Sequence, residues 1–334
     1  ADEVLGIGFK MADKMAAGAG IAADDPNRVK AAVKYVLNTA AANGDCYLPK
    51  ERLIAQAVDL LQLHPLAIEN AIRDLQVNSQ LLQEKLNGED CVYLNYYFYA
   101  EMSVAKRLLE LSAEYDAPNM ESIATEIARV EKETGVVLAE EQRAAVAEAL
   151  SCGVLIITGG PGTGKTTTIN TILRILKKED MDVVLAAPTG RAAKRMTEAT
   201  GMEAQTIHRL LGISFIGEDS RRQTFDKNEE NPIEADVIII DESSMVDIVL
   251  MQALLRAVES GSRIIFVGDV DQLPSVGAGN VLKDMIRSER LKVVRLQHVF
   301  RQAQESAIIM NAHRINQGEE LCMLAALIGI KRDM

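Results

Sequence analysis

The chain has 334 residues, of which 48% are hydrophobic and 25% charged, proportions typical of folded globular domains. This length leaves room for two or three domains, each with its own core. The sequence has no apolar run long enough to span a bilayer and no pattern of a secretory signal, so no membrane partner is expected. The net charge of −12 disfavours a broad nucleic-acid-binding surface, but a narrow basic channel remains compatible with it.

The cysteines indicate a reducing compartment. The four of them are widely separated and form no C-x-x-C pair: Cys46, Cys91, Cys152 and Cys322. This spacing argues against a zinc site or a disulfide framework. We therefore expect a cytoplasmic protein.

The first part of the chain is predicted to be mostly helical. A Gly-x-Gly turn in Leu5–Lys10 precedes a helical pattern over Met11–Ala17, an arrangement that resembles the second half of a helix-hairpin-helix DNA-binding element. A packing corner between two helices explains these residues equally well. Apolar periodicity predicts three further helices: Asn27–Ala42, Lys50–Leu61 and Pro65–Asn78.

A hairpin is expected next, with strands Leu81–Leu86 and Cys91–Tyr96 around the turn residues Asn87-Gly88. Helix, helix and hairpin together resemble a winged-helix module, which could contact DNA or be purely structural. The aromatic cluster Tyr93–Tyr99 could stack on bases, although packing at a domain edge is the commoner use. Helices are predicted over Glu101–Glu114 and Glu121–Thr134.

From Val137 onward, short β-branched runs alternate with helical segments, which predicts a parallel sheet covered by helices on both faces. Ligands of such sheets bind beyond the carboxyl ends of the strands. The five predicted strands are Val154–Thr158, Val183–Ala187, Val237–Ile240, Arg263–Val267 and Val293–Leu296.

The stretch Gly159–Thr166 (GGPGTGKT) matches a phosphate-binding loop between a strand and the helix Thr167–Leu176. Glycines let backbone N–H groups surround phosphate oxygens, and the helix N-terminus favours the same anion. Lys165 is expected to reach the β- and γ-phosphates of ATP, and Thr166 to ligate Mg²⁺. The other predicted nucleotide-binding residues of the loop are Gly160, Pro161, Gly162, Thr163, Gly164 and Thr167.

Three further segments suggest hydrolysis of ATP. Asp241 and Glu242 directly follow an apolar strand, where Asp241 would hold Mg²⁺ and Glu242 would deprotonate the attacking water. Gln272, after the next strand, could contact the γ-phosphate or its water, and a glycine–proline loop with incidental polar residues explains the segment equally well. Arg301 follows the last strand and could stabilise the charge of the transition state, although alone it would read as a surface arginine.

Other strand ends are suited to nucleic acid. Pro188, Thr189, Gly190 and Arg191 stand between a strand and a helix N-terminus, which suits contact with a nucleic-acid backbone. Thr206 and His208 could lie on the same surface, although a structural histidine is equally compatible. Residues 213–225 read as a hairpin that could act as a wedge or be a surface loop.

These segments together resemble the RecD-like branch of superfamily 1 DNA helicases, related to the exodeoxyribonuclease V alpha chain. The resemblance rests on motifs in order from Val137 to Gly318: GGPGTGKTTT (159–168), APTGRAAKRM (187–196), TIHRLLG (206–212), IIIDESSMVD (238–247), VGDVDQLPSVGAGNVL (267–282) and VFRQAQ (299–304). It implies an α/β fold with a RecA-like P-loop core and ATP-driven 5′→3′ movement on single-stranded DNA, in DNA repair or recombination.

The same resemblance assigns further roles. Gln142 matches a motif that reads adenine, and residues 213–225 would form a strand-separating pin. Single-stranded DNA and DNA junctions would be the partners, and the DNA path would be lined by Pro188, Thr189, Gly190, Arg191, Thr206 and His208. A monomer is expected.

The domain layout that follows has four parts. An accessory domain spans 1–110, a connecting helix 111–136 and the ATPase domain 137–296, with an incomplete second RecA-like domain in 297–334. Residues 319–334 do not read as the family's continuation, so we expect part of a longer protein, with weak or absent unwinding by this chain alone. Two alternatives stay open at this point: a P-loop ATPase of the clamp-loader or remodelling type, and a nucleotide-binding adaptor without turnover.

Overall fold

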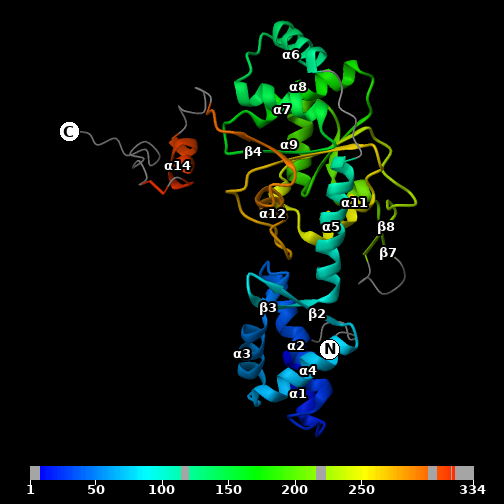
Figure 1. Cartoon of the computed structure of the whole chain (residues 1–334), viewed down its shortest axis with the longest axis vertical. Helices are drawn as coiled ribbons and strands as arrows, with labels where there is room; N and C mark the ends of the chain where they lie inside the picture. Colours follow the sequence, from blue (N-terminus) through cyan, green and yellow to red (C-terminus); the bar gives the residue numbers. More distant parts are fainter. Residues whose placement is uncertain (1–7, 114–119, 216–222, 300–306, 317, 320–334) are drawn as a thin grey trace, which may run out of the picture. The chain divides into compact units, whose positions relative to one another are not determined.

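The computed structural model describes residues 8–113, 120–215, 223–299, 307–316 and 318–319 (Figure 1). The chain forms two compact units. Unit 1 consists of Ala1–Ala105, Asp247–Gln252 and Ser275–Asn280, and unit 2 consists of Lys106–Val246, Ala253–Pro274 and Val281–Met334.

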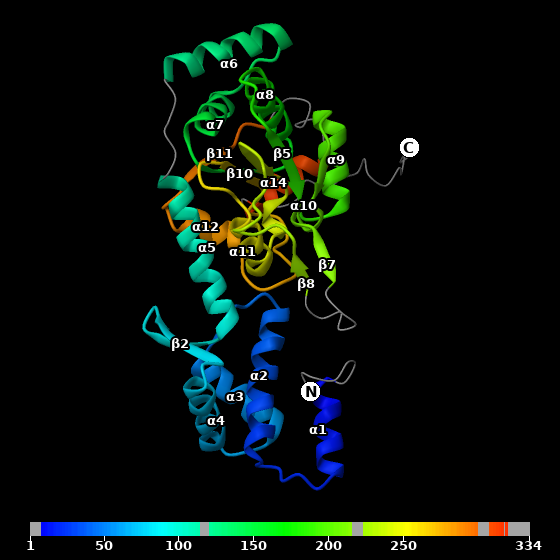
Figure 2. The same cartoon turned by 90° about the vertical axis from the view of Figure 1, so that its right-hand side faces the viewer.

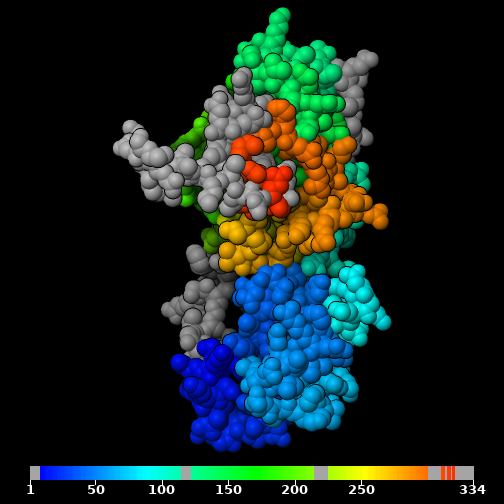
Figure 3. Space-filling model, turned by 90° about the vertical axis from the view of Figure 1, so that its left-hand side faces the viewer, coloured from blue at the N-terminus to red at the C-terminus, as the bar shows by residue number. Residues whose placement is uncertain are grey.

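A local capping signal stands at the start of α2 (Pro26–Ala42). The Asp25 carboxylate accepts the N–H groups of Asn27 and Arg28, and Pro26 occupies the first turn, where its missing N–H costs nothing. The helices are α1 Phe9–Gly18, α2 Pro26–Ala42, α3 Lys50–Leu61 and α4 Pro65–Val77. The predictions for α2, α3 and α4 are confirmed to within one residue at each end. Helices α2, α3 and α4 pack against one another around an aliphatic core. Figure 3 shows the surface of this part of the chain in shades of blue.

Unit 1 also contains an antiparallel sheet in the order β1-β3-β2, with strands β1 Tyr47–Pro49, β2 Leu81–Leu86 and β3 Glu89–Leu94. Asn87 and Gly88 both have positive φ (50° and 91°), as a two-residue hairpin turn requires. The predicted second strand, Cys91–Tyr96, was wrong at both ends. Pairing with β2 extends β3 back to Glu89, and the helix α5 Asn95–Ala113 begins after Leu94.

The aromatic cluster therefore lies mainly on a helix. The Tyr93 ring, almost fully buried, lies 5.0 Å from the Tyr47 ring and 5.4 Å from the Phe98 ring, measured between centroids. These contacts bury aromatic surface inside unit 1. Packing thus accounts for Tyr93, whereas Tyr96 and Tyr99 keep about half of their surface exposed.

Two short segments from late in the chain belong to unit 1. The N–H of Gly279 donates to the carbonyl of Gly44 over 2.9 Å. Gly279 has a φ of +93°, and a Cβ there would lie 3.3 Å from the sulfur of Cys46. Glycine is thus required at this contact, both for its backbone conformation and for its lack of a side chain.

Unit 2 is built on a six-stranded parallel sheet in the order β11-β4-β10-β9-β5-β6. Its strands are β4 Val154–Gly159, β5 Val183–Ala187, β6 Ala204–Thr206, β9 Val237–Ile240, β10 Arg263–Gly268 and β11 Lys292–Leu296. The five predicted strands are confirmed, three with one extra residue. The strand β6 was missed, since its three residues, Ala-Gln-Thr, carry no apolar run.

Helices cover the sheet because both sets of alternating side chains are apolar. One set packs under α6, α7, α8 and α9 and includes Leu155, Ile157, Leu185, Ile239, Ile265 and Val267. The opposite set is equally buried and includes Val154, Ile156, Ile238, Ile240, Ile264 and Phe266. Burial of both faces is what a parallel sheet requires.

The helices of unit 2 include α6 Met120–Thr134, α7 Glu140–Ser151, α8 Lys165–Lys178, α9 Gly190–Thr200, α10 Ile207–Leu211, α12 Val281–Arg287 and α14 Ala307–Asn316. Helix α11, Ile248–Arg256, spans the two units. In unit 2, α6, α7 and α8 lie side by side (Figure 1), and α8 and α9 flank β5 (Figure 2). Among the residues that the structure describes, no helix has the length and hydrophobicity to cross a membrane.

The predicted hairpin is present at its base. Strands β7 Ile213–Phe215 and β8 Gln223–Phe225 pair antiparallel, with Ile213 opposite Phe225. Its predicted tip lies outside the described residues, as do residues 320–334, so the role of a pin stays a prediction.

Val237, on the central strand β9, is fully buried, whereas Val137 is 77% exposed. We expect Val237→Ala to lower the free energy of unfolding by about 2 kcal/mol, because two buried methyl groups are lost and a cavity remains. The identical change Val137→Ala should stay within about 0.5 kcal/mol of the parent. Urea unfolding followed by circular dichroism measures both, and equal effects would contradict the assigned core.

Candidate active site

The loop after β4 adopts backbone conformations that only its glycines adopt without strain. Gly162 and Gly164 have φ of 80° and 81°, a region that side chains disfavour. A Cβ on Gly159 would lie 2.7 Å from both the carbonyl oxygen of Leu296 and the hydroxyl of Thr163. The loop then leads into α8 with Gly164 as its N-cap residue. The predicted order of strand, glycine loop and helix is thus confirmed.

The ammonium group of Lys165 is held against this loop. It donates to the carbonyls of Gly159 and Gly160, the latter over 3.1 Å. Burial lowers the pKa of Lys165, and the negative charges of Asp269, Asp241 and Glu242 partly oppose that effect. The lysine is therefore a desolvated cation that faces three carboxylates.

Gln142 reaches the same loop from the start of α7. Its side-chain oxygen accepts the N–H of Ala139 (3.0 Å), and its amide nitrogen donates to the carbonyls of Thr163 (3.4 Å) and Gly164 (3.2 Å). The residue is only 1% exposed. Gln142 thus ties α7 to the phosphate-binding loop, while its reading of adenine stays a prediction.

Asp241 and Glu242 follow β9, on the same sheet edge as the loop. The N–H of Glu242 donates to the Asp241 carboxylate (2.9 Å), and Glu242 has a positive φ of 51°, an uncommon conformation for such a residue. Burial raises the pKa of Asp241. Burial and the charge of Asp241 raise the pKa of Glu242, with Lys165 and Arg195 opposing. Two closely spaced carboxylates are kept here at an energetic cost.

Sequence reasoning missed a third carboxylate, Asp269, which follows β10 between the loop and Asp241. It is 3% exposed, and its carboxylate accepts the N–H of Asp271 (3.1 Å) and the amide of Gln272 (3.2 Å). Gln272, which was predicted to sense the γ-phosphate, is exposed. Its hydrogen bond to Asp269 links it to the site. The position of Asp269 directly after a buried strand was the signal that could have revealed it.

The predicted DNA-contacting residues come together at the neighbouring strands. Ala187 at the end of β5 pairs with Thr206 at the end of β6. Thr189 caps α9 by accepting the N–H of Ala192 (3.2 Å), and Thr206 caps α10 by accepting the N–H of Arg209 (3.1 Å). Two helix N-termini therefore open at one edge, with Pro188, Gly190 and Arg191 around the first of them.

His208 lies on α10, with its ring centroid 6.1 Å from that of Phe225 at the base of the hairpin. Thr166 is exposed in the first turn of α8, beside the partly exposed Thr167. Arg301 lies outside the described residues, so the structure does not place it.

A second residue that sequence reasoning missed is Arg195 of α9. Its guanidinium Nη1 lies 3.7 Å from a carboxylate oxygen of Glu242. Its position four residues after Arg191 places both side chains on one face of the helix. Nothing in the sequence around Arg195 distinguishes it from the neighbouring Lys194; the contact arises from the packing of α9.

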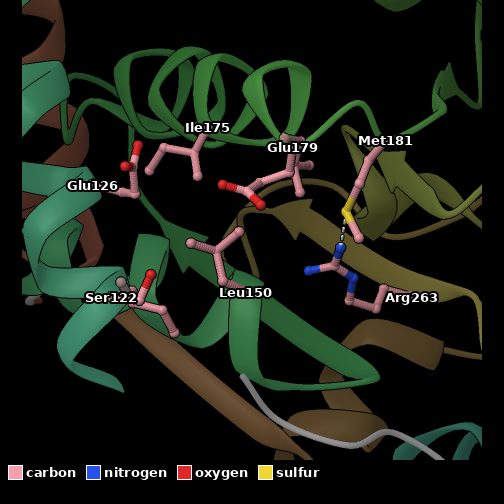
Figure 4. A pocket seen from close by; sticks show the side chains of 9 residues that line it. Ser122, Glu126, Leu150, Ile175, Glu179, Met181 and Arg263 are labelled. Atoms are coloured by element: carbon pink, nitrogen blue, oxygen red, sulfur yellow. Dashed lines mark hydrogen bonds between the residues drawn. The ribbon is translucent and has the colours of Figure 1, made fainter. Parts of the chain in front are cut away.

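Unit 2 also has a pocket near the other end of the strands (Figure 4). It measures about 190 Å³ and is lined by Ser122, Glu126, Leu150, Ile175, Glu179 and Arg263, among others. Arg263 stands at the start of β10 and contacts the sulfur of Met181. None of the predicted site residues lines this pocket. Those that the structure describes lie instead at the sheet edge that carries the phosphate-binding loop, and this edge is the candidate active site.

A phosphate-binding loop, a partly buried lysine and paired carboxylates at one sheet edge define a P-loop nucleotide-binding protein. The family model described as "AAA domain" matches residues 137–329, and the chain belongs to this family. The model described as "ATP-dependent RecD2 DNA helicase HHH domain" matches residues 1–47. These matches confirm the predicted similarity to RecD-like proteins. The predicted α/β fold of the core and the predicted binding of a nucleotide are confirmed as well.

Among curated relatives, the ATP-dependent RecD2 DNA helicase of Deinococcus radiodurans is 36% identical over 95% of this chain and 44% of its own length. The RecBCD enzyme subunit RecD of Mycolicibacterium smegmatis is 43% identical over 44% of this chain and 30% of its own length. The chain thus spans less than half the length of these relatives. The solved Pif1 helicase from Candida albicans is 27% identical over 50% of this chain and 41% of that chain, with a TM-score of 0.37.

The raised pKa of Asp241 predicts that replacing its carboxylate by a neutral side chain stabilises the folded protein, by an amount that depends on pH. Its carboxylate is less favourable in the folded than in the unfolded chain, so it destabilises the fold at pH 7. This penalty fades as pH falls through the folded-state pKa and is gone below the ordinary value of 3.8. We therefore expect Asp241→Asn to raise the free energy of unfolding at pH 7 and to change it far less near pH 3.5.

Urea unfolding at both pH values measures this difference. Asp180→Asn, on an exposed turn where Asn tolerates the positive φ, is the matched control and should change the free energy of unfolding by less than about 0.5 kcal/mol. A loss of stability in Asp241→Asn at pH 7 would contradict the prediction.

Proposed function

We propose that the chain is the ATPase part of an ATP-dependent DNA helicase that moves 5′→3′ on single-stranded DNA in DNA repair or recombination. The observation that carries this proposal is the shared edge of β4, β10, β9, β5 and β6. The residues suited to ATP follow the first three strands, and those suited to DNA follow the last two. The names of the relatives, a RecD2 DNA helicase and a RecBCD enzyme subunit, support the same assignment.

ATP would bind with its phosphates against the backbone N–H groups of residues 160–166 and the ammonium of Lys165. Thr166 and Asp241 would hold Mg²⁺, and a hydroxyl with a carboxylate oxygen fits the hard-oxygen preference of this ion. When bound, Mg²⁺ neutralises charge on the β- and γ-phosphate oxygens.

Glu242 would accept the proton of the attacking water. The charge of Lys165 helps to keep the Glu242 carboxylate ionised, since it opposes the effect of burial on the pKa. Gln272, linked through Asp269 to the site, would sense the γ-phosphate. Arg301 is proposed to stabilise the transition state.

The DNA backbone would bind at the N-termini of α9 and α10, through Pro188, Thr189, Gly190, Arg191, Thr206 and His208. Helix N-termini and exposed guanidinium groups suit phosphate contacts. The hairpin β7–β8 beside His208 would separate the strands of a DNA junction. Neither a partner subunit nor a membrane enters this scheme.

The first test is steady-state hydrolysis of ATP with and without oligo-dT. We expect oligo-dT to raise the rate, and Lys165→Ala and Glu242→Gln each to lower kcat by about 100-fold or more, since each removes a group that acts in the transition state. Glu242→Gln should retain ATP binding in equilibrium dialysis, because the loop and lysine are intact.

Unchanged turnover in Glu242→Gln would favour a nucleotide-binding adaptor over an enzyme. A rate of hydrolysis per chain that does not respond to oligo-dT but increases with protein concentration would favour a clamp-loader type of ATPase, whose arginine comes from a neighbouring subunit.

A second test concerns DNA. Arg191→Ala should weaken binding of oligo-dT and reduce the slope of log K against log salt by about 0.7, the change for one lost phosphate contact on a single strand. Lys177→Ala, at the exposed far end of α8, removes an equal charge and should leave the slope unchanged. Fluorescence anisotropy over a salt titration measures the slope for each variant. Equal slopes for Arg191→Ala and Lys177→Ala would show that Arg191 does not contact the DNA.

A further inference from the structure

Helix α9 connects the two parts of the candidate site. Its N-terminus, with Thr189 as cap and Arg191 in the first turn, belongs to the proposed DNA path. One turn later, Arg195 reaches the carboxylate of Glu242 on the ATP side, with 3.7 Å between nitrogen and oxygen. The helix has 11 residues and packs on β5 and β6 through the buried Ala193 and Met196. It is therefore a short rigid element between two predicted ligands.

The backbone of Glu242 is held by its own neighbours. Its φ is +51°, its N–H donates to Asp241, and its carbonyl accepts the N–H of Met245 over 3.1 Å. Its side chain depends on another element. Among the described residues, the ion pair to Arg195 is the one that the Glu242 carboxylate makes.

The exposures show from which side this contact is made. The Arg195 side chain is 80% exposed, whereas that of Glu242 is 21% exposed. The guanidinium thus approaches from the solvent side of α9, where a change in the helix position would alter the contact.

We propose that Arg195 is a positioning residue that orients the Glu242 carboxylate for hydrolysis and makes this orientation depend on DNA bound at the N-terminus of α9. The inference rests on the proposed function. A general base must be aligned with its water, and a displacement of about 1 Å can cost on the order of 100-fold in rate. An arginine is suited to hold a carboxylate, because its planar donors restrict the geometry of the pair.

The test compares Arg195→Ala with Lys194→Ala. The two side chains are adjacent on α9 and equally exposed, at 80% and 79%, but Lys194 pairs with Glu198 instead. For Arg195→Ala we expect kcat with saturating oligo-dT to fall about ten-fold. The KM for ATP and the Kd for oligo-dT should change by less than about two-fold, because uniform binding is untouched. Lys194→Ala should match the parent in all three quantities.

Arg195→Lys and Arg195→Gln separate charge from mere bulk. Lysine keeps the positive charge and should recover part of kcat, while glutamine, of similar length but neutral, should not. The exposure of Arg195 makes a folding defect unexpected, and circular dichroism of each variant checks this.

Three outcomes would overturn the proposal. If Arg195→Ala and Lys194→Ala behave alike in a DNA-stimulated parent, the role of Arg195 fails while the proposed function stands. A raised KM for ATP or Kd for oligo-dT with unchanged kcat would make Arg195 a ligand contact instead. If the parent chain binds ATP but hydrolyses none with oligo-dT, the proposed function fails and this role with it.

Discussion

The register of four parallel strands is the constraint on which the candidate site depends. Residue by residue, Thr158 of β4 pairs with Gly268 of β10, Phe266 of β10 with Ile240 of β9, and Ile240 with Ala186 of β5. Gly159, Asp269, Asp241 and Pro188 therefore leave the sheet at one edge, although more than a hundred residues separate the first from the second. A slip of one residue would exchange the side chains that pack on the two faces of a strand, and because both faces are closely packed against different neighbours, packing opposes such a slip.

The site that results is electrostatically costly. Lys165 is desolvated, and burial raises the pKa of both Asp241 and Glu242. Mutual attraction between the lysine and the carboxylates offsets only part of the desolvation. The structure tolerates this arrangement because buried aliphatic strands on both faces stabilise the sheet beneath it. Such a balance between a strained site and a stable scaffold is common at functional sites.

Separate motifs are linked by a few polar contacts. Gln142 connects α7 to the phosphate-binding loop, Asp269 connects Gln272 to the neighbourhood of Lys165, and Arg195 connects α9 to Glu242. The Arg195 contact joins the helix after β5 to the residue after β9, and the Gln142 contact joins a helix to the loop after β4. The Asp269 contact lies within the loop after β10.

Local chemistry determined much of this protein from sequence alone. Apolar periodicity defined α2, the Asn-Gly turn defined the hairpin, β-branched runs defined five strands, and Gly162 and Gly164 defined the phosphate-binding loop. These signals need only neighbouring residues, because they arise from φ preferences and side-chain periodicity. Tertiary structure alone decided the start of α5 at Asn95, the pairing of the polar strand β6, and the ion pair of Arg195 with Glu242. Those features depend on partners distant in the chain, whose positions are set only when the buried faces of sheet and helices pack together.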